Sequence, residues 1–229
     1  MGTDDLFHRR KARKAETLRR KLAKRAPYDV VLIVCEGLKT EPYYFSELRK
    51  HLRLSNANIV IADKKTGTDP LSVVNFAIEE YKKEKDLPYD RVYCVFDKDK
   101  HTSYAAALDK ISNTHLKRGA PIHAITSVPC FEIWLLLHYT YTTRSFSAAG
   151  DASNCELVVS EIKNYIPDYQ KGSKDIFSTI ADKMDTAITN AKKLDNFHKT
   201  SGTDNPSTKV HELVEYLQDL KNKIYEAKQ

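Results

Sequence analysis

Three carboxylates occupy positions in the chain at which metal sites are commonly built. Glu36 ends the apolar run 30–35, and Asp97 and Asp99 follow a second apolar run, 92–96. Carboxylate oxygens are the preferred ligands of Mg²⁺ and Mn²⁺, and two aspartates spaced i, i+2 on a loop can both face one ion. We therefore expect Glu36, Asp97 and Asp99 to share one metal pocket, provided that the two runs are neighbouring strands.

The two apolar runs are typical of strands buried on both faces of a parallel sheet. Segments of helical spacing separate them, and this β-α-β-α-β alternation implies right-handed crossovers between parallel strands. The strands would then bring their carboxylates to the C-terminal edge, where open α/β sheets bind ligands. The sequence predicts strands 28–35, 56–61, 92–96 and 122–126, and helices 41–54, 70–85, 104–116, 131–138, 155–164, 176–197 and 208–228.

The composition of the 229 residues is that of a soluble globular protein, 41% apolar and 30% charged. No apolar stretch approaches the roughly 20 residues of a membrane span, and the N-terminus is charged, so we expect a cytoplasmic protein without membrane contact. The four cysteines form no C-x-x-C pair. We expect them to be reduced, buried thiols.

The first 26 residues account for the whole net charge of +6: ten Lys/Arg against three acidic residues give +7 there, and the remaining 203 residues sum to −1. Basic segments of this kind commonly bind nucleic-acid phosphates, and a solvated tail is the alternative. The predicted phosphate-binding residues in this arm are Arg9, Arg10, Lys11, Arg13 and Lys14. In the loop after the second apolar run, the predicted phosphate-binding residues are Lys98, Lys100 and His101.

Four motifs are spread over residues 30–210. They are V-C-E-G-x-x-T-E-x-x-Y-F from Val34, F-D-x-D from Phe96, S-x-P-x-F-E-x-W-L-x-x-H from Ser127, and N-P-S-T from Asn205. Together they resemble the RloB-like proteins, a TOPRIM-related bacterial family found beside restriction and abortive-infection loci. The resemblance implies a TOPRIM-like Rossmannoid parallel sheet flanked by helices. We expect a basic arm (1–26), a TOPRIM-like α/β core (27–140) and a helical C-terminal extension packed on the core (141–229).

The resemblance also implies a role for each site residue. The glutamate of the first motif, Glu36, would be a metal ligand or a general acid/base, and Asp97 and Asp99 would hold the metal. Glu132 would complete a second metal position, and Lys171 would stabilise the charge of the transition state. The chain departs from many TOPRIM loops in having Lys100-His101 after its second aspartate.

These features favour an Mg²⁺- or Mn²⁺-dependent nuclease that acts on RNA, including tRNA, or on DNA in bacterial antiviral defence. No Walker-type segment is present, so an ATPase function would come from a partner encoded nearby, as the resemblance implies. Two rival functions remain, a non-catalytic nucleic-acid-binding subunit of a defence complex and a primase-type nucleotidyl transferase. The sequence leaves oligomerisation open.

Each candidate residue also has a structural alternative. Glu36 and Asp97 could cap the helices that follow them. Glu132 could interact only with the dipole of the helix in whose first turn it is predicted to lie. His101 and His138 could be ordinary loop and core histidines, and Lys171 and Lys174 ordinary surface lysines.

Overall fold

The computed structural model describes residues 29–54, 57–61, 69–84, 88–148 and 152–226. The basic arm lies outside the described residues, so its predicted contacts with phosphate stay predictions.

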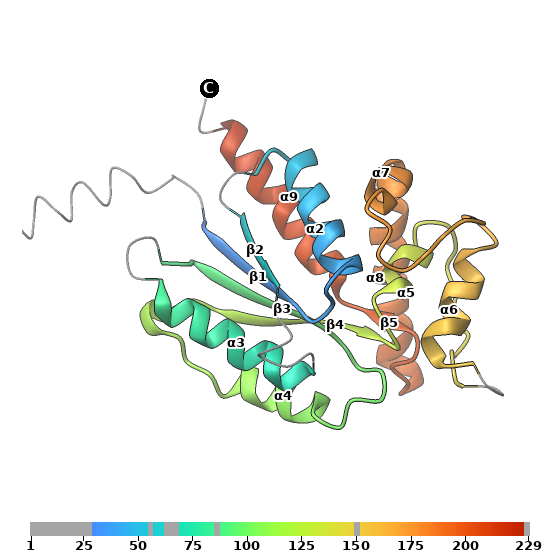
Figure 1. The fold of residues 1–229 in the computed structure, drawn as a ribbon, viewed down its shortest axis with the longest axis horizontal. Coiled ribbons are helices and arrows are strands. Elements are labelled where there is room, and N and C mark those ends of the chain that lie inside the picture. Colours follow the sequence, from blue (N-terminus) through green and yellow to red (C-terminus); the bar gives the residue numbers. More distant parts are fainter. Residues whose placement is uncertain (1–28, 55–56, 62–68, 85–87, 149–151, 227–229) are drawn as a thin grey trace, which may run out of the picture.

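A mostly parallel open sheet forms the centre of the molecule (Figure 1). Its strands are β1 (Val31–Cys35), β2 (Ala57–Ile61), β3 (Arg91–Asp97), β4 (Ile122–Val128) and the two-residue β5 (Ser207–Thr208). Their order is β2-β1-β3-β4-β5, in which only β5 runs antiparallel. The chain reverses its winding direction between β1 and β3, and such a switch point is where doubly wound sheets bind ligands.

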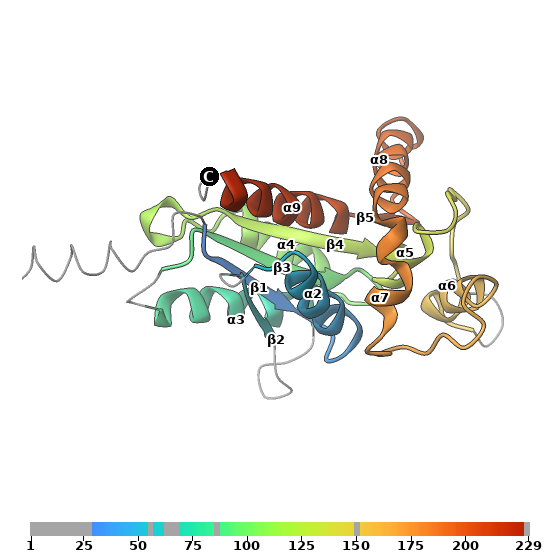
Figure 2. The ribbon, with the colours of Figure 1, turned by 90° about the horizontal axis from the view of Figure 1, so that it is seen from above.

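Helices cover both faces of the sheet (Figures 1 and 2). α3 (Pro70–Lys83) and α4 (Tyr104–Ser112) lie on one face, and α2 (Thr40–His51) and α9 (Val210–Glu226) lie on the other. Alternate residues of β1 and β3 serve the two cores, so that in β1 Leu32 and Val34 pack towards α3 while Val31, Ile33 and Cys35 pack towards α2. This burial on both faces accounts for the uninterrupted apolar run in the sequence.

The remaining helices gather beyond the carboxyl ends of the strands (Figure 1). They are α5 (Glu132–Leu136), α6 (Asn154–Ile162), α7 (Ile176–Ile180) and α8 (Met184–Ser201). Buried residues from all four join the core on the α2 side of the sheet. The C-terminal third of the chain therefore completes the core and also forms the wall opposite the strand ends.

The prediction of one continuous helix over 176–197 is wrong. A 3-10 turn, Ala181–Lys183, separates α7 from α8. No glycine or proline marks this break; instead α7 packs against α2 while α8 packs against α9, and one straight helix could not follow both surfaces. Among the described residues, no helix combines the length and apolar character needed to cross a bilayer.

Candidate active site

Glu36 and Asp97 lie side by side at the switch point between β1 and β3. The Glu36 N–H donates to Val95 O at 2.9 Å, and the Asp97 N–H donates to Glu36 Oε2 at 3.0 Å. The expectation that these two strands are neighbours is therefore confirmed. The capping alternative is wrong for both residues, because α2 begins after Lys39 and α4 after Ser103, and neither N-terminus receives a side-chain cap.

A third carboxylate, Glu41, joins them from the first turn of α2, although it was not among the site residues predicted from the sequence. It is 92% buried. Together with Glu36 and Asp97 it lines a cavity of about 470 Å³. A Cβ added to Gly37 would lie 2.0 Å from Glu41 Oε2, so the glycine lets this carboxylate rest against the turn. In the sequence, the Thr40-Glu41 pair of the first motif could have identified Glu41 as a site residue.

The carboxylates of the cavity disfavour one another's ionisation. Burial and the charge of Glu41 raise the pKa of Glu36 to about 7, and burial and the charge of Glu132 raise the pKa of Glu41 to about 7. Burial, with the charges of Glu41, Glu132 and Glu36, raises the pKa of Asp97 well above its usual range. Such mutual repulsion marks a site that is built to meet positive charge rather than to stabilise the fold.

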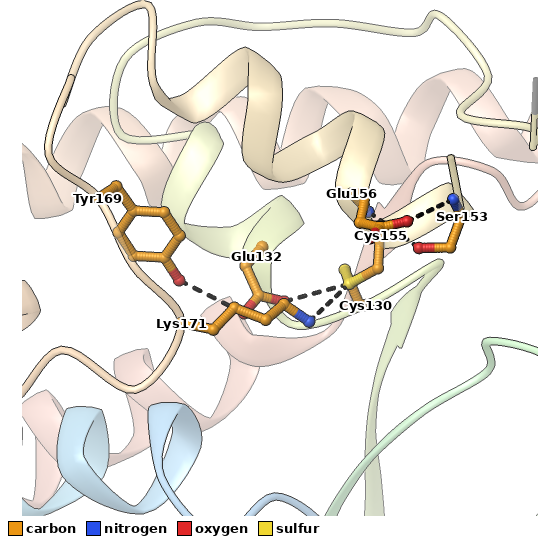
Figure 3. The surroundings of a disulfide bond; sticks show 7 residues. All are labelled: Cys130, Glu132, Ser153, Cys155, Glu156, Tyr169 and Lys171. Atoms are coloured by element: carbon orange, nitrogen blue, oxygen red, sulfur yellow. Dashed lines mark hydrogen bonds and ion pairs between the residues drawn. A yellow bond between two sulfur atoms is a disulfide. The ribbon is translucent and has the colours of Figure 1, made fainter. Parts of the chain in front are cut away.

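Glu132, the fourth carboxylate, comes from α5 and is 97% buried. Lys171 Nζ lies 3.3 Å from Glu132 Oε2, and the Tyr169 hydroxyl donates to Glu132 Oε1 at 3.3 Å (Figure 3). Because its carboxylate is bonded inside the protein, a role limited to the helix dipole is excluded. Lys171 is half-exposed, lines the cavity and pairs with the buried Glu132.

Lys171 reaches the site because the segment after α6 closes over the β1–α2 turn. The Gly172 N–H donates to Thr40 Oγ1 at 3.0 Å. Gly172 has φ +80°, and a Cβ there would lie 2.9 Å from the Cβ of Lys39. A glycine is therefore needed beside the lysine, both for the backbone conformation and for the close approach.

The expectation of four reduced cysteines is wrong for two of them. Cys130 and Cys155 form a disulfide that joins the start of α5 to α6, immediately beside Glu132 and Lys171 (Figure 3). Lys171 Nζ lies 2.9 Å from Cys155 Sγ. The two cysteines are 25 residues apart, and only the packing of α5 against α6 brings them together. Cys35 and Cys94 are free and buried, as expected.

The residues of the loop after β3 differ in their partners and in whether they line the cavity. His101 Nε2 pairs with Glu36 Oε1 at 2.9 Å and lines the cavity. Asp99 is exposed, with a left-handed φ of 26°, and does not line the cavity, although its charge contributes to the raised pKa of Glu36. Lys98 pairs with Asp204, and Lys100 is exposed.

Two further candidates lie away from the cavity. His138 is 99% buried, its Nδ1 lies 2.9 Å from Trp134 O, and burial lowers its pKa to about 4, so it is a core histidine. Lys174 lies over the ring of Tyr43, with its Nζ 5.8 Å from the ring centroid.

The donor set of the cavity fits a hard divalent cation. Glu36, Glu41, Asp97 and Glu132 offer only oxygen atoms, and burial together with neighbouring carboxylate charges raises the pKa values of Glu36, Glu41 and Asp97. Two sets of three ligand atoms within 4.8 Å of one another occur among the described residues, and the cavity carboxylates are neither of them. Cys130, Glu132 and Cys155 form one set, but its two cysteines are joined in the disulfide; Asp195, His211 and Glu212 form the other. Mg²⁺ keeps several waters and is held by one or two carboxylates plus substrate phosphates, so it does not require such a close set.

Comparison with known proteins gave one match. The family model described as RloB-like protein matches residues 31–217, a range that includes every residue of the cavity. Neither the curated proteins nor the solved structures gave a match.

Proposed function

Because the chain belongs to the RloB-like protein family, we propose that it is an Mg²⁺- or Mn²⁺-dependent nuclease with a TOPRIM-like core, acting in bacterial antiviral defence. One observation carries this proposal. Four carboxylates and Lys171, drawn from separate parts of the chain, line a single cavity at the switch point of the sheet.

Glu36, Glu41, Asp97 and Glu132 are the residues that would hold the metal. When bound, a divalent cation supplies a nucleophilic water at neutral pH and neutralises the charge on the phosphate. The alternative role for Glu36 is to accept and return a proton, and its pKa of about 7 in the metal-free protein suits that role near neutral pH. His101, 2.9 Å from Glu36, orients that carboxylate.

Lys171 would stabilise the negative charge that develops on the phosphate during cleavage. Its ammonium is held beside Glu132 and faces the cavity. A fixed positive group next to the reacting atoms stabilises a transition state more than it stabilises the substrate. Nucleic acid, RNA or DNA, is the proposed substrate, and an ATPase encoded nearby is the proposed partner.

Cleavage of labelled tRNA, single-stranded RNA, single-stranded DNA and duplex DNA, with Mg²⁺ or Mn²⁺, tests the proposal. Glu36→Gln and Asp97→Asn should each abolish cleavage. Glu47→Gln, on the exposed face of α2, should leave it intact. A real cleavage activity that survived both active-site substitutions would show that this cavity is not the catalytic centre.

The same assay separates the rival functions. Binding without turnover on all four substrates would favour a non-catalytic subunit, and incorporation of nucleotides would favour the primase-type transferase.

A further inference from the structure

A long groove lies between α3 and α4, on the face of the sheet opposite α2. Two cavities, of about 560 and 540 Å³, follow each other along it. The first is lined by Leu71 and Asn75 of α3 and by residues of α4, and the second continues past the C-terminal ends of both helices. Lys110 and Thr114 line both cavities, so the two form one continuous surface, the α3–α4 groove.

The far end of the α3–α4 groove is strongly basic. Its charged lining consists of Lys82, Lys110, Lys117 and Arg118 against the single carboxylate Glu84. All four cations are exposed, and within the described part of the chain none forms an ion pair with a carboxylate. Some lysines elsewhere on the surface are paired, as Lys83 is with Glu80 and Lys192 with Glu215. This end of the groove therefore presents unneutralised positive charge to a ligand.

The N-terminal end of α3 is bonded to the loop that carries His101. Asp69, the cap of α3, accepts a hydrogen bond of 2.7 Å from Ser103, the residue before α4. Ser103 lies two residues after His101, which pairs with Glu36 in the cavity. α3 has 14 residues, about 21 Å, so the basic end of the groove lies about that far along α3 from Asp69.

We infer that the α3–α4 groove binds a single strand of nucleic acid whose continuation enters the carboxylate cavity. This inference rests on the proposed nuclease function and names the surface that holds its substrate.

The lining, apart from the carboxylate of Asp109 in the first cavity, matches the chemistry of such a strand. The basic end neutralises phosphates, and the amides of Asn75 and Asn113 can hydrogen-bond to phosphate or sugar oxygens. Pro88, Tyr81 and Leu116 give the basic end an apolar floor against which bases can pack.

Binding of 20-nucleotide single-stranded RNA and DNA to the full chain tests the inference. The assay uses fluorescence anisotropy, the cleavage-deficient Asp97→Asn background and no divalent metal, over a series of salt concentrations. The triple variant K82Q/K117Q/R118Q should bind at least tenfold more weakly. The slope of log affinity against log salt should fall by about 2, since each lost phosphate contact removes about 0.7 from it.

Two further variants make the test specific. K163Q/K193Q/K199Q removes three exposed charges from α6 and α8 and should bind like the parent protein. N75E/N113E places two negative charges in the middle of the groove and should weaken binding at least threefold, which an isolated basic patch at the far end would not predict.

Parent-like affinity and salt slope in K82Q/K117Q/R118Q would overturn the inference, as would equal losses in the control variant. The nuclease proposal would stand in either case, because cleavage by the protein with Asp97 intact is measured separately. Strong groove-dependent binding with no cleavage of any substrate would instead reject the nuclease and keep the groove.

Discussion

Replacing Glu41 by glutamine should make the metal-free protein more stable at alkaline pH. Glu41 is buried, and burial together with the charge of Glu132 raises its pKa from 4.5 to about 7. A carboxyl group whose pKa is higher in the folded state binds more protons there than in the unfolded chain. Its favourable effect on stability is therefore present at low pH and is lost as pH rises from 4.5 through 7.

The size of the effect follows from the same pKa change. A pKa raised from 4.5 to about 7 corresponds to about 3 kcal/mol of destabilisation once the group is ionised in both states. Glutamine has a similar shape without the charge. The free energy of unfolding of Glu41→Gln should exceed that of the parent by about 3 kcal/mol at pH 8 and by less than about 1 kcal/mol at pH 5.

Urea unfolding at pH 5 and pH 8, with EDTA or with Mg²⁺ or Mn²⁺, measures the free energy of unfolding of the metal-free and of the metal-bound protein. Metal should stabilise the parent at pH 8, because a ligand that binds only the folded state raises the free energy of unfolding. The same concentration should stabilise Glu41→Gln much less. Glu47→Gln is the matched control: it removes one charge from an exposed ion pair of the same helix, and its effect should stay below about 1 kcal/mol at both pH values.

Two results would refute the reasoning. One is a Glu41→Gln protein that is less stable than the parent at pH 8 without metal, which would show that the carboxylate serves the fold. The other is an undiminished stabilisation by metal, which would show that Glu41 takes no part in holding the ion.

Four other predictions follow from single features of the molecule. Gly37→Ala should displace the Glu41 carboxylate and reduce cleavage at least tenfold, with an unchanged circular dichroism spectrum. Lys171→Ala should lower the single-turnover cleavage rate about 100-fold, with partial recovery in Lys171→Arg. Cys155→Ser should lower the free energy of unfolding by about 3 kcal/mol in urea, and reductant should do the same to the parent but not to the variant. Deleting residues 1–25 should weaken nucleic-acid binding and flatten its salt dependence, and unchanged binding would assign the arm another purpose.

Most of the helices and strands could be predicted from the sequence. The apolar runs gave β1 and β3 because a strand buried on both faces of a sheet needs uninterrupted Val, Leu and Ile. Asp69-Pro70 correctly marked the start of α3, since the Asp69 side chain accepts hydrogen bonds from Leu71 and Ser72. From the alternation of elements alone, Glu36 and Asp97 could be placed at one edge of the sheet.

The composition of the site was only partly predictable. Glu41 was overlooked because a glutamate near a helix start has an ordinary role there. Its approach to Gly37 depends on how the turn folds back. Asp99 lies two residues after Asp97, a spacing that predicted two ligands of one ion. Its backbone is left-handed, however, and Asp99 lies outside the cavity.

The sequence by itself thus determined the strands, the carboxylates at their ends and the family. The family resemblance named Glu132 and Lys171, and the tertiary structure showed that they line one cavity with Glu36. Only the tertiary structure joined Cys130 to Cys155 and aligned α3 with α4 into a basic groove. The physical reason is the range of the interactions. Strand periodicity and helix caps depend on neighbours a few residues away, whereas the site is assembled from segments up to 136 residues apart, between Glu36 and Gly172, by packing that no local pattern records.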